Sequence, residues 1–101
     1  MAILHTVNKS PFDKNSLERA FSTAKDGSSV LLLEDGVYGA IKGAKSSAMV
    51  EDAMKTVKVY ALSADVDARG VKGHVMDGIE LVDYAKFVEL AAEHSQVQSW
   101  L

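Results

Sequence analysis

Cysteine is the most informative absence in this chain, because none of its 101 residues is a cysteine. Without thiols the polypeptide can form no disulfide, no thiolate zinc site and no iron–sulfur cluster. Catalysis by a cysteine nucleophile on this chain is likewise excluded. The three histidines, His5, His74 and His94, are too far apart in the sequence for the spacing of a metal site. We therefore expect neither a metal nor a cofactor.

An excess of positive charge is also missing. The chain carries 11 basic and 14 acidic residues, which gives a net charge of -3. The basic residues are scattered along the sequence, so no broad cationic field is available for phosphates. Direct binding of DNA or tRNA by this chain alone is therefore not expected.

Long apolar runs are absent as well. No apolar window approaches the roughly 20 residues that a bilayer span requires, and the start, MAILHTV, is too short and too soon polar for a signal peptide. We expect no membrane contact and a cytoplasmic location. Because the chain has only 101 residues, of which 48% are hydrophobic, we expect a single domain over residues 1–101.

The clearest feature that is present is the run from Val30 to Leu33, which stops at Glu34-Asp35-Gly36 and is followed by an amphipathic segment. A strand that is apolar on both faces belongs in a parallel sheet covered by helices on each side. Ligands of such sheets usually bind beyond the carboxyl ends of the strands. The run therefore predicts an α/β fold and directs attention to the corner that follows it.

Strand and helix patterns alternate along the rest of the chain. Strands are expected over residues 2–7, 29–33, 57–62 and 79–82, with helical segments after residue 15, over 37–41, from 48 to 54, over 63–68 and after residue 83. The last residues, from Ser95, form a tail. This order predicts a three-layer helix-sheet-helix sandwich with a mostly parallel four- to five-stranded sheet.

Three residues are expected to cap helices. Asn15 caps the first, with Glu18 at the spacing of a capping box, and Ser63 and Asp83 cap the two later helices. One apolar face is expected on the last helix. Its residues are Tyr84, Phe87, Val88, Ala91 and Ala92.

Several separated pieces of the sequence resemble one family, in that family's order. They are Leu4-His5-Thr6 with Ser10-Pro11, Leu31 to Val37, Val59 to Leu62, Asp65 with Ala68-Arg69-Gly70, Asp83-Tyr84 with Phe87-Val88, and Trp100 near the end of the sequence. Each piece is weak alone, whereas their joint occurrence at this length is specific. On these residues the chain resembles the DsrH/TusB family, whose members belong to the cytoplasmic DsrEFH and TusBCD sulfur-relay complexes.

The resemblance implies a DsrE-like α/β fold and obligate partners. These would be a DsrE/TusD-like and a DsrF/TusC-like homologue in a heterohexamer, with a sulfur-acceptor protein as a further partner. Sulfur would pass as a persulfide toward 2-thiolation of the wobble uridine of tRNA, or toward sulfur oxidation in DsrEFH-like systems.

Some members of this family carry a cysteine in the first helix, and Ala20 stands at the position that we match to it. A methyl group cannot hold a persulfide, and methionine thioethers cannot do so either. The principal sulfur-carrying cysteine of these complexes belongs to the DsrE/TusD-type partner. The resemblance therefore implies a structural or docking role, with no catalytic residue on this chain.

Two groups of polar candidates each have a structural and a functional interpretation. His5, near the end of the first strand, could act as an acid or base, but it has no evident catalytic partner and is better interpreted as a hydrogen-bonded structural residue. Glu34 and Asp35 could act as a carboxylate pair, but adjacent side chains on an extended chain point apart. The Asp35-Gly36 corner before a helix is better explained by turn and cap chemistry.

The remaining candidates come from a helix and from apolar residues. Asp65 and Arg69, before Gly70, most simply stabilise their own helix, while their match to the family motif leaves an interface role open. Apolar residues that a small sheet cannot easily cover often mark interfaces. Val37, Tyr38 and Trp100 are candidates of this kind. Packing of Trp100 back onto its own domain is an equally good interpretation.

Two functions from different classes follow. The first is a docking subunit of a sulfur-relay complex, which is expected to self-associate when its partners are absent. The alternative is a stand-alone small-ligand or nucleotide-binding α/β domain that uses the Asp35–Gly36 edge, although the glycines nearby lack both the GxGxxG spacing and a following Lys-Ser/Thr. An autonomous hydrolase is third, because no nucleophile elbow is present.

Overall fold

The computed structural model describes residues 2–101, and in them one five-stranded sheet has the order β4-β3-β2-β1-β5. Its strands are β1 (Ile3–Val7), β2 (Ser29–Leu32), β3 (Lys58–Leu62), β4 (Glu80–Val82) and β5 (Gln96–Trp100). Every neighbouring pair runs parallel. The expected α/β class and parallel sheet are thus confirmed, with five strands.

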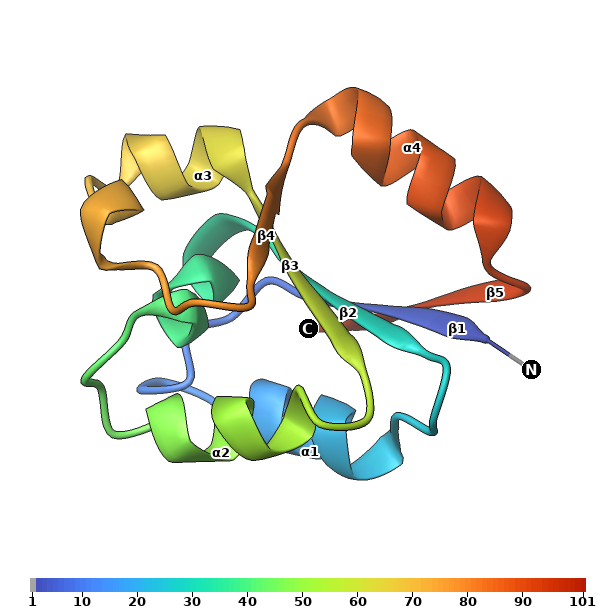
Figure 1. Cartoon of the computed structure of the whole chain (residues 1–101), viewed down its shortest axis with the longest axis horizontal. Helices are drawn as coiled ribbons and strands as arrows, with labels where there is room; N and C mark the ends of the chain where they lie inside the picture. The colour runs from blue at the N-terminus through green and yellow to red at the C-terminus, as the bar shows by residue number, and fades with distance from the viewer. Residues whose placement is uncertain (1) are drawn as a thin grey trace.

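Helices lie on both faces of this sheet. They are α1 (Ser16–Thr23), α2 (Ser47–Ala53), α3 (Ser63–Ala68) and α4 (Tyr84–Glu93), with short 3₁₀ segments η1 (Glu34–Ala40) and η2 (Lys72–His74). Figure 1 shows α1 and α2 on one side of the sheet and α4 on the other. The three layers expected from the sequence are therefore present, and no helix within residues 2–101 is long and apolar enough to cross a membrane.

Two apolar clusters correspond to the two faces. The larger joins Leu17 and Ala20 of α1 and Val50 of α2 to inward residues of the strands, such as Val30 and Val59. The smaller lies beneath α4. It contains Leu4, Leu31, Tyr60, Leu62, Val82 and Leu90. Because β2 contributes to both clusters, its four residues are all buried, which explains its unbroken apolar sequence.

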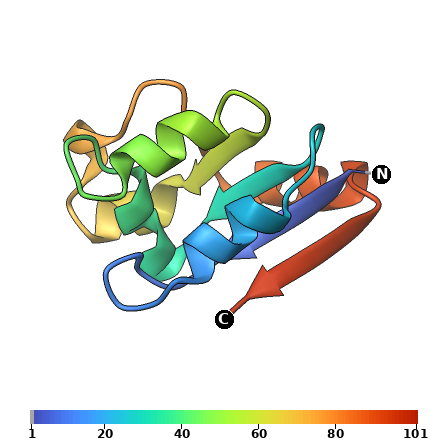
Figure 2. The same cartoon turned by 90° about the horizontal axis from the view of Figure 1, so that it is seen from below.

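The expected tail from Ser95 is instead an edge strand. β5 pairs with β1 along its whole length, from Ile3 opposite Gln96 to Val7 opposite Trp100. Figure 2 shows β5 at the margin of the sheet beside β1. Its sequence, QVQSW, is mostly polar because an edge strand keeps much of its surface exposed. The hydrophobic pattern alone therefore gave little sign of a strand.

Of the expected caps, only Asp83 forms one. Its side chain accepts a hydrogen bond from the Lys86 backbone N–H at 2.8 Å. Asn15 makes no capping bond, because its φ of -93° and ψ of 18° depart from the extended backbone that a capping side chain needs. Ser63 is the first residue of α3 and does not cap it.

The buried face of α4 also differs from the expected one. Leu90 is buried, with Phe87 and Ala91 packed beside it. Tyr84 and Val88 are 60% and 69% exposed. The difference arises because these two residues lie along the flank of α4 and turn away from the strands that the helix covers.

Candidate functional site

Polar side chains from three separate segments meet at the carboxyl ends of the central strands, in what we call the carboxyl-edge cluster: Asn8, Glu34, Asp35, Asp65 and Arg69. The Nε and Nη2 atoms of Arg69 each lie 2.9 Å from Asp35 Oδ1. The Glu34 backbone N–H donates to Asp65 Oδ2 at 2.7 Å, and Asn8 Nδ2 donates to Glu34 Oε1 at 3.3 Å. The cluster therefore connects the residues that follow β1 and β2 with α3.

The Asp65–Arg69 pair expected within α3 is present, but it is the longer of the contacts that Arg69 makes. Arg69 Nη1 lies 3.8 Å from Asp65 Oδ1, whereas Arg69 Nε and Nη2 each lie 2.9 Å from Asp35 Oδ1. Arg69 therefore connects two elements more than it stabilises its own helix. Gly70, with a φ of +66°, ends that helix as expected.

The backbone at this corner is unusual at two positions. Glu34 has a φ of +49°, in the left-handed region that side chains other than glycine rarely adopt. A Cβ atom at Gly36 would overlap the backbone oxygen of Val7, so only glycine fits there. The backbone approach between β1 and the corner accounts for Gly36 without any bound phosphate.

Glycine at position 39 has a similar explanation, since a Cβ atom there would come within 2.7 Å of Leu17 Cδ2. The residues expected to be exposed here are not. Val37 is completely buried in the larger cluster and Tyr38 is half-buried. The expectation that Val37 lies at the surface is therefore wrong, because η1 turns it inward against the sheet.

The second candidate region is where the edge strand β5 pairs with β1. His5 is 1% exposed, and Trp100 Nε1 donates a hydrogen bond to His5 Nδ1 at 3.1 Å. Since the indole can only donate, the neutral imidazole carries its proton on Nε2. That Nε2 atom has no hydrogen-bond partner among residues 2–101. Burial lowers the pKa of His5 below its usual 6.5.

This arrangement favours the structural interpretation of His5 and of Trp100. No carboxylate contacts the imidazole among the described hydrogen bonds, so it has no partner for acid–base chemistry. Trp100 packs against its own core, and the Arg19 guanidinium carbon lies 5.8 Å from the centroid of the indole ring. The edge strand is thereby attached to β1 and α1.

Ala20, matched above to a cysteine of the family, is completely buried in the larger apolar cluster. Its methyl group lies on the side of α1 that packs against the sheet. Even a thiol at this position would therefore be covered in the isolated chain.

Sequence reasoning missed two members of these groups, Asn8 and Arg19. Both act through residues distant in the chain, Glu34 and Trp100, and no local spacing signals such contacts. His94, the residue after α4, contacts the Leu90 carbonyl oxygen at 2.6 Å and Ser29 Oγ at 3.0 Å through its two ring nitrogens.

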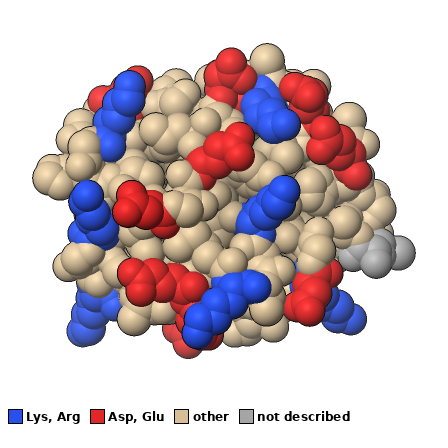
Figure 3. Space-filling model, in the orientation of Figure 1, with Lys and Arg blue, Asp and Glu red and all other residues tan. Residues whose placement is uncertain are grey.

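The charged side chains of Asp35, Asp65 and Arg69 in the carboxyl-edge cluster are paired with one another. Arg69 is engaged by carboxylates, and within residues 2–101 no three His, Asp or Glu side chains converge as metal ligands would. On the face shown in Figure 3, blue and red side chains are intermixed, with no broad basic area. The arrangement can fix backbone segments against one another and present a surface.

Comparison with known proteins gives relatives at both the sequence and the structure level. Residues 9–97 match the family model described as DsrH like protein. The chain is 38% identical to Protein TusB of Enterobacter sp. (strain 638) over 98 residues, which is 97% of this chain and 100% of that protein. Protein TusB of Escherichia coli (strain K12) is also 38% identical, over 100 residues, with the same coverage of both chains.

Solved structures show the same fold at lower sequence identity. The ychN protein of E. coli superposes with a TM-score of 0.82 at 17% identity, covering 98% of each chain. A protein of unknown function from Methanobacterium thermoautotrophicum gives a TM-score of 0.78 at 15% identity, covering 96% of this chain and 97% of that one. The fold agreement and the match over residues 9–97 lead to one conclusion: the chain belongs to the DsrH-like family.

Proposed function

We propose that this protein is a non-catalytic docking subunit of a sulfur-relay complex. The observation that carries the proposal is the full-length similarity to TusB proteins, at 38% identity, in a chain that contains no cysteine. A persulfide requires a thiolate, so sulfur would be carried by a partner. This subunit would hold the cysteine-bearing chains in place.

The site geometry supports a role in positioning. The carboxyl-edge cluster fixes the ends of β1 and β2 against α3 through side chains that are partly exposed, with Asp35 at 57%. A preformed surface of this kind loses little conformational entropy when a partner binds. Asp35, Tyr38, Asp65 and Arg69 are therefore the residues that we propose for partner contact, with Gly36, Val37 and Gly70 shaping the backbone beneath them.

The finer assignment follows the TusB relatives. We propose that the partners are TusD-like and TusC-like homologues in a cytoplasmic heterohexamer, that sulfur passes to an acceptor protein, and that the pathway serves 2-thiolation of the tRNA wobble uridine. Dissimilatory sulfur oxidation is the second candidate, because the family model is named for DsrH. We also propose that residues 1–101 act as one domain.

Native mass spectrometry of the chain co-expressed with the homologues from its own gene cluster tests this function. We expect one complex that contains all three kinds of subunit. Arg69→Ala should weaken it, whereas Lys25→Ala, on an exposed residue outside the carboxyl-edge cluster, should leave it intact. A stable lone monomer in the presence of the partners would contradict the proposal.

The pathway is tested separately, by analysis of tRNA nucleosides after deletion of the gene. Loss of wobble 2-thiouridine, restored by the wild-type chain, is expected. Unchanged 2-thiouridine together with defective sulfur oxidation would favour the second candidate.

A further inference from the structure

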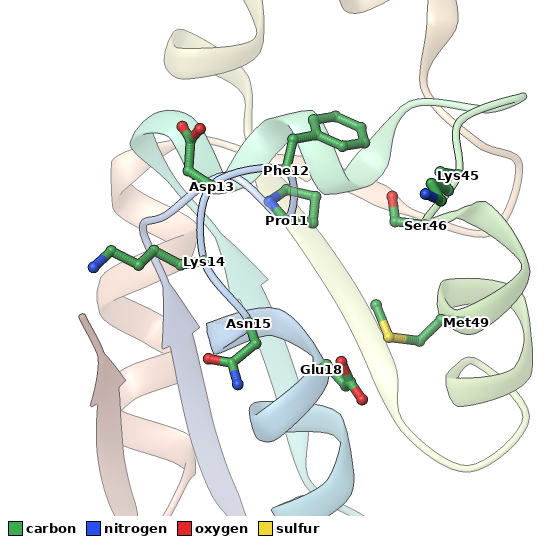
Figure 4. Close-up of a pocket in the computed structure, with 9 residues that line it drawn as sticks. All are labelled: Pro11, Phe12, Asp13, Lys14, Asn15, Glu18, Lys45, Ser46 and Met49. Carbon is green, nitrogen blue, oxygen red and sulfur yellow. The ribbon is translucent and has the colours of Figure 1, made fainter.

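A hollow of about 380 Å³ lies beside the loop that leaves β1 and is not accounted for by the assembly role. Its walls come from this loop, from α1 and from the start of α2, as Figure 4 shows. Pockets of roughly 300–1,000 Å³ hold small organic ligands. The hollow also lies at the carboxyl end of a strand, where open α/β sheets usually bind their ligands.

The apolar wall is formed by Pro11, Phe12 and Met49. Phe12 is 57% exposed, and in Figure 4 its ring extends from the loop toward the side of the hollow that carries Ser46. An aromatic ring left open beside an apolar thioether and a proline can cover the apolar part of a ligand. Because the ring is not held by the core, it can also move to admit one.

Polar groups with unused bonding capacity border the apolar wall. Ser46 is only 9% exposed, yet its hydroxyl has no hydrogen-bond partner among residues 2–101. Lys45 and Glu18 also line the hollow, and neither forms an ion pair within residues 2–101. Asp13 and Lys14 also line the hollow, but in Figure 4 their side chains extend away from Met49. One cation and one anion therefore remain to meet a ligand.

We infer that this hollow binds a small zwitterion with an apolar side chain, that is, an amino acid or a short peptide. The ligand's carboxylate would lie toward Lys45 and the Ser46 hydroxyl, its ammonium group toward Glu18, and its apolar side chain against Phe12 and Met49. A buried hydroxyl without a partner is unfavourable, so a ligand oxygen that bonds to Ser46 removes an existing cost. A ligand with only one charge would leave either Lys45 or Glu18 unpaired.

The probe for this site is L-phenylalanine, added to the ¹⁵N-labelled full chain and followed by amide chemical shifts. We expect shifts confined to residues 11–18 and 45–49, with a Kd on the order of 1 mM or tighter. N-acetyl-L-phenylalanine lacks the ammonium charge, and L-phenylalaninamide lacks the carboxylate. Each should bind about 5-fold more weakly, the fold-change that corresponds to about 1 kcal/mol for an exposed ion pair.

Substitutions assign each charge to its partner. Lys45→Met should weaken L-phenylalanine binding about 5-fold and leave the amide unaffected, whereas Glu18→Gln should weaken L-phenylalanine binding and leave the N-acetyl compound unaffected. Ser46→Ala should weaken every ligand that keeps the carboxylate. The matched controls are Lys25→Met and Glu51→Gln, at exposed positions outside the hollow. Absence of localised shifts, or equal binding of all three compounds, would overturn the inference.

Discussion

At the residue scale, the hydrogen bond between Trp100 and His5 couples the protonation state of the His5 imidazole to the stability of the fold. The indole donates to Nδ1 at 3.1 Å, which requires an unprotonated nitrogen. A proton added to Nδ1 would abolish this bond and place a charge in a side chain that is only 1% exposed. The charged residue that packs on the pair is Arg19 of α1, whose guanidinium carbon lies 5.8 Å from the centroid of the Trp100 ring.

Stability should therefore depend on pH through His5. Burial lowers the pKa of His5 in the folded chain below 6.5, so below pH 6.5 the unfolded chain binds more protons than the folded one. The stability contribution is present above pH 6.5 and is lost as the pH falls toward the folded pKa. The loss is at most about 1.4 kcal/mol per pH unit for one proton.

Urea unfolding, followed by the fluorescence of Trp100, the single tryptophan, measures the free energy of unfolding between pH 7.5 and 5.5. His5→Asn supplies the control, because its amide oxygen can accept the indole bond and does not titrate. We expect the wild type to lose more stability than the variant over this range. Parallel pH profiles for the two proteins would show that His5 does not titrate in the way that its burial requires.

Position 20 gives a second test at this scale, because Ala20 is completely buried against the sheet. Ala20→Cys should fold with little loss of stability, since it adds only one sulfur atom in the core. Its thiol should gain no sulfur from a persulfide donor under native conditions. Ser22→Cys, at an exposed position of α1, should gain it readily. Intact-mass analysis before and after reduction distinguishes the two, and rapid labelling of the Ala20→Cys thiol would mean that α1 opens easily.

At the scale of elements, the contacts between the corner after β2 and α3 differ in strength. Asp65 accepts the Glu34 N–H at 2.7 Å and its side chain is 18% exposed, whereas Asp35 contacts Arg69 with its side chain 57% exposed. Hydrogen bonds to a charged group contribute about 1.5–3 kcal/mol, while exposed ion pairs contribute about 0–1 kcal/mol.

Asp65→Ala should therefore lower the free energy of unfolding by about 1–3 kcal/mol, and Asp35→Ala by less than about 1 kcal/mol. The Asp65 carboxylate also helps to hold Glu34 at its φ of +49°, which adds to the difference. Urea unfolding at pH 7 checks both values. Equal losses for the two variants would indicate that Arg69, and not the Glu34 N–H, carries the contribution of Asp65.

The same elements show what the sequence could and could not predict. β2, β3 and the cap at Asp83 were predictable, because continuous burial and local hydrogen bonds leave a direct pattern in neighbouring residues. β5 was not, since an edge strand with exposed Gln96 and Gln98 has no apolar run. The contact of Arg69 with Asp35 was missed for a different reason. It depends on how β2 and α3 are placed, which no spacing within either segment records.

At the scale of the whole molecule, exposed apolar residues gather on the side of the sheet that carries α4. Tyr84 and Val88 project from this helix. Val97 pairs with Leu4, which belongs to the cluster beneath α4, and paired residues of parallel strands face the same side. Val97 is 47% exposed. The outer edge of β5 also has no neighbouring strand within residues 2–101, so this side of the molecule combines apolar side chains with free backbone groups.

Self-association of the isolated chain should therefore occur through the α4 and β5 side. Exposed apolar patches of several hundred Å² are rarely left uncovered in a soluble protein, and we expect dimers or larger species in sedimentation velocity at low micromolar concentration. Val88→Lys and Val97→Lys should each shift the distribution toward monomer, because a charge would then be desolvated in the contact. Thr23→Lys, at an exposed position of α1 on the opposite side of the sheet, introduces the same charge and should leave the distribution unchanged. If all variants and the wild type sediment as monomers, the α4 and β5 side does not drive self-association. If Thr23→Lys dissociates the assembly as well, the contact does not lie on the α4 and β5 side.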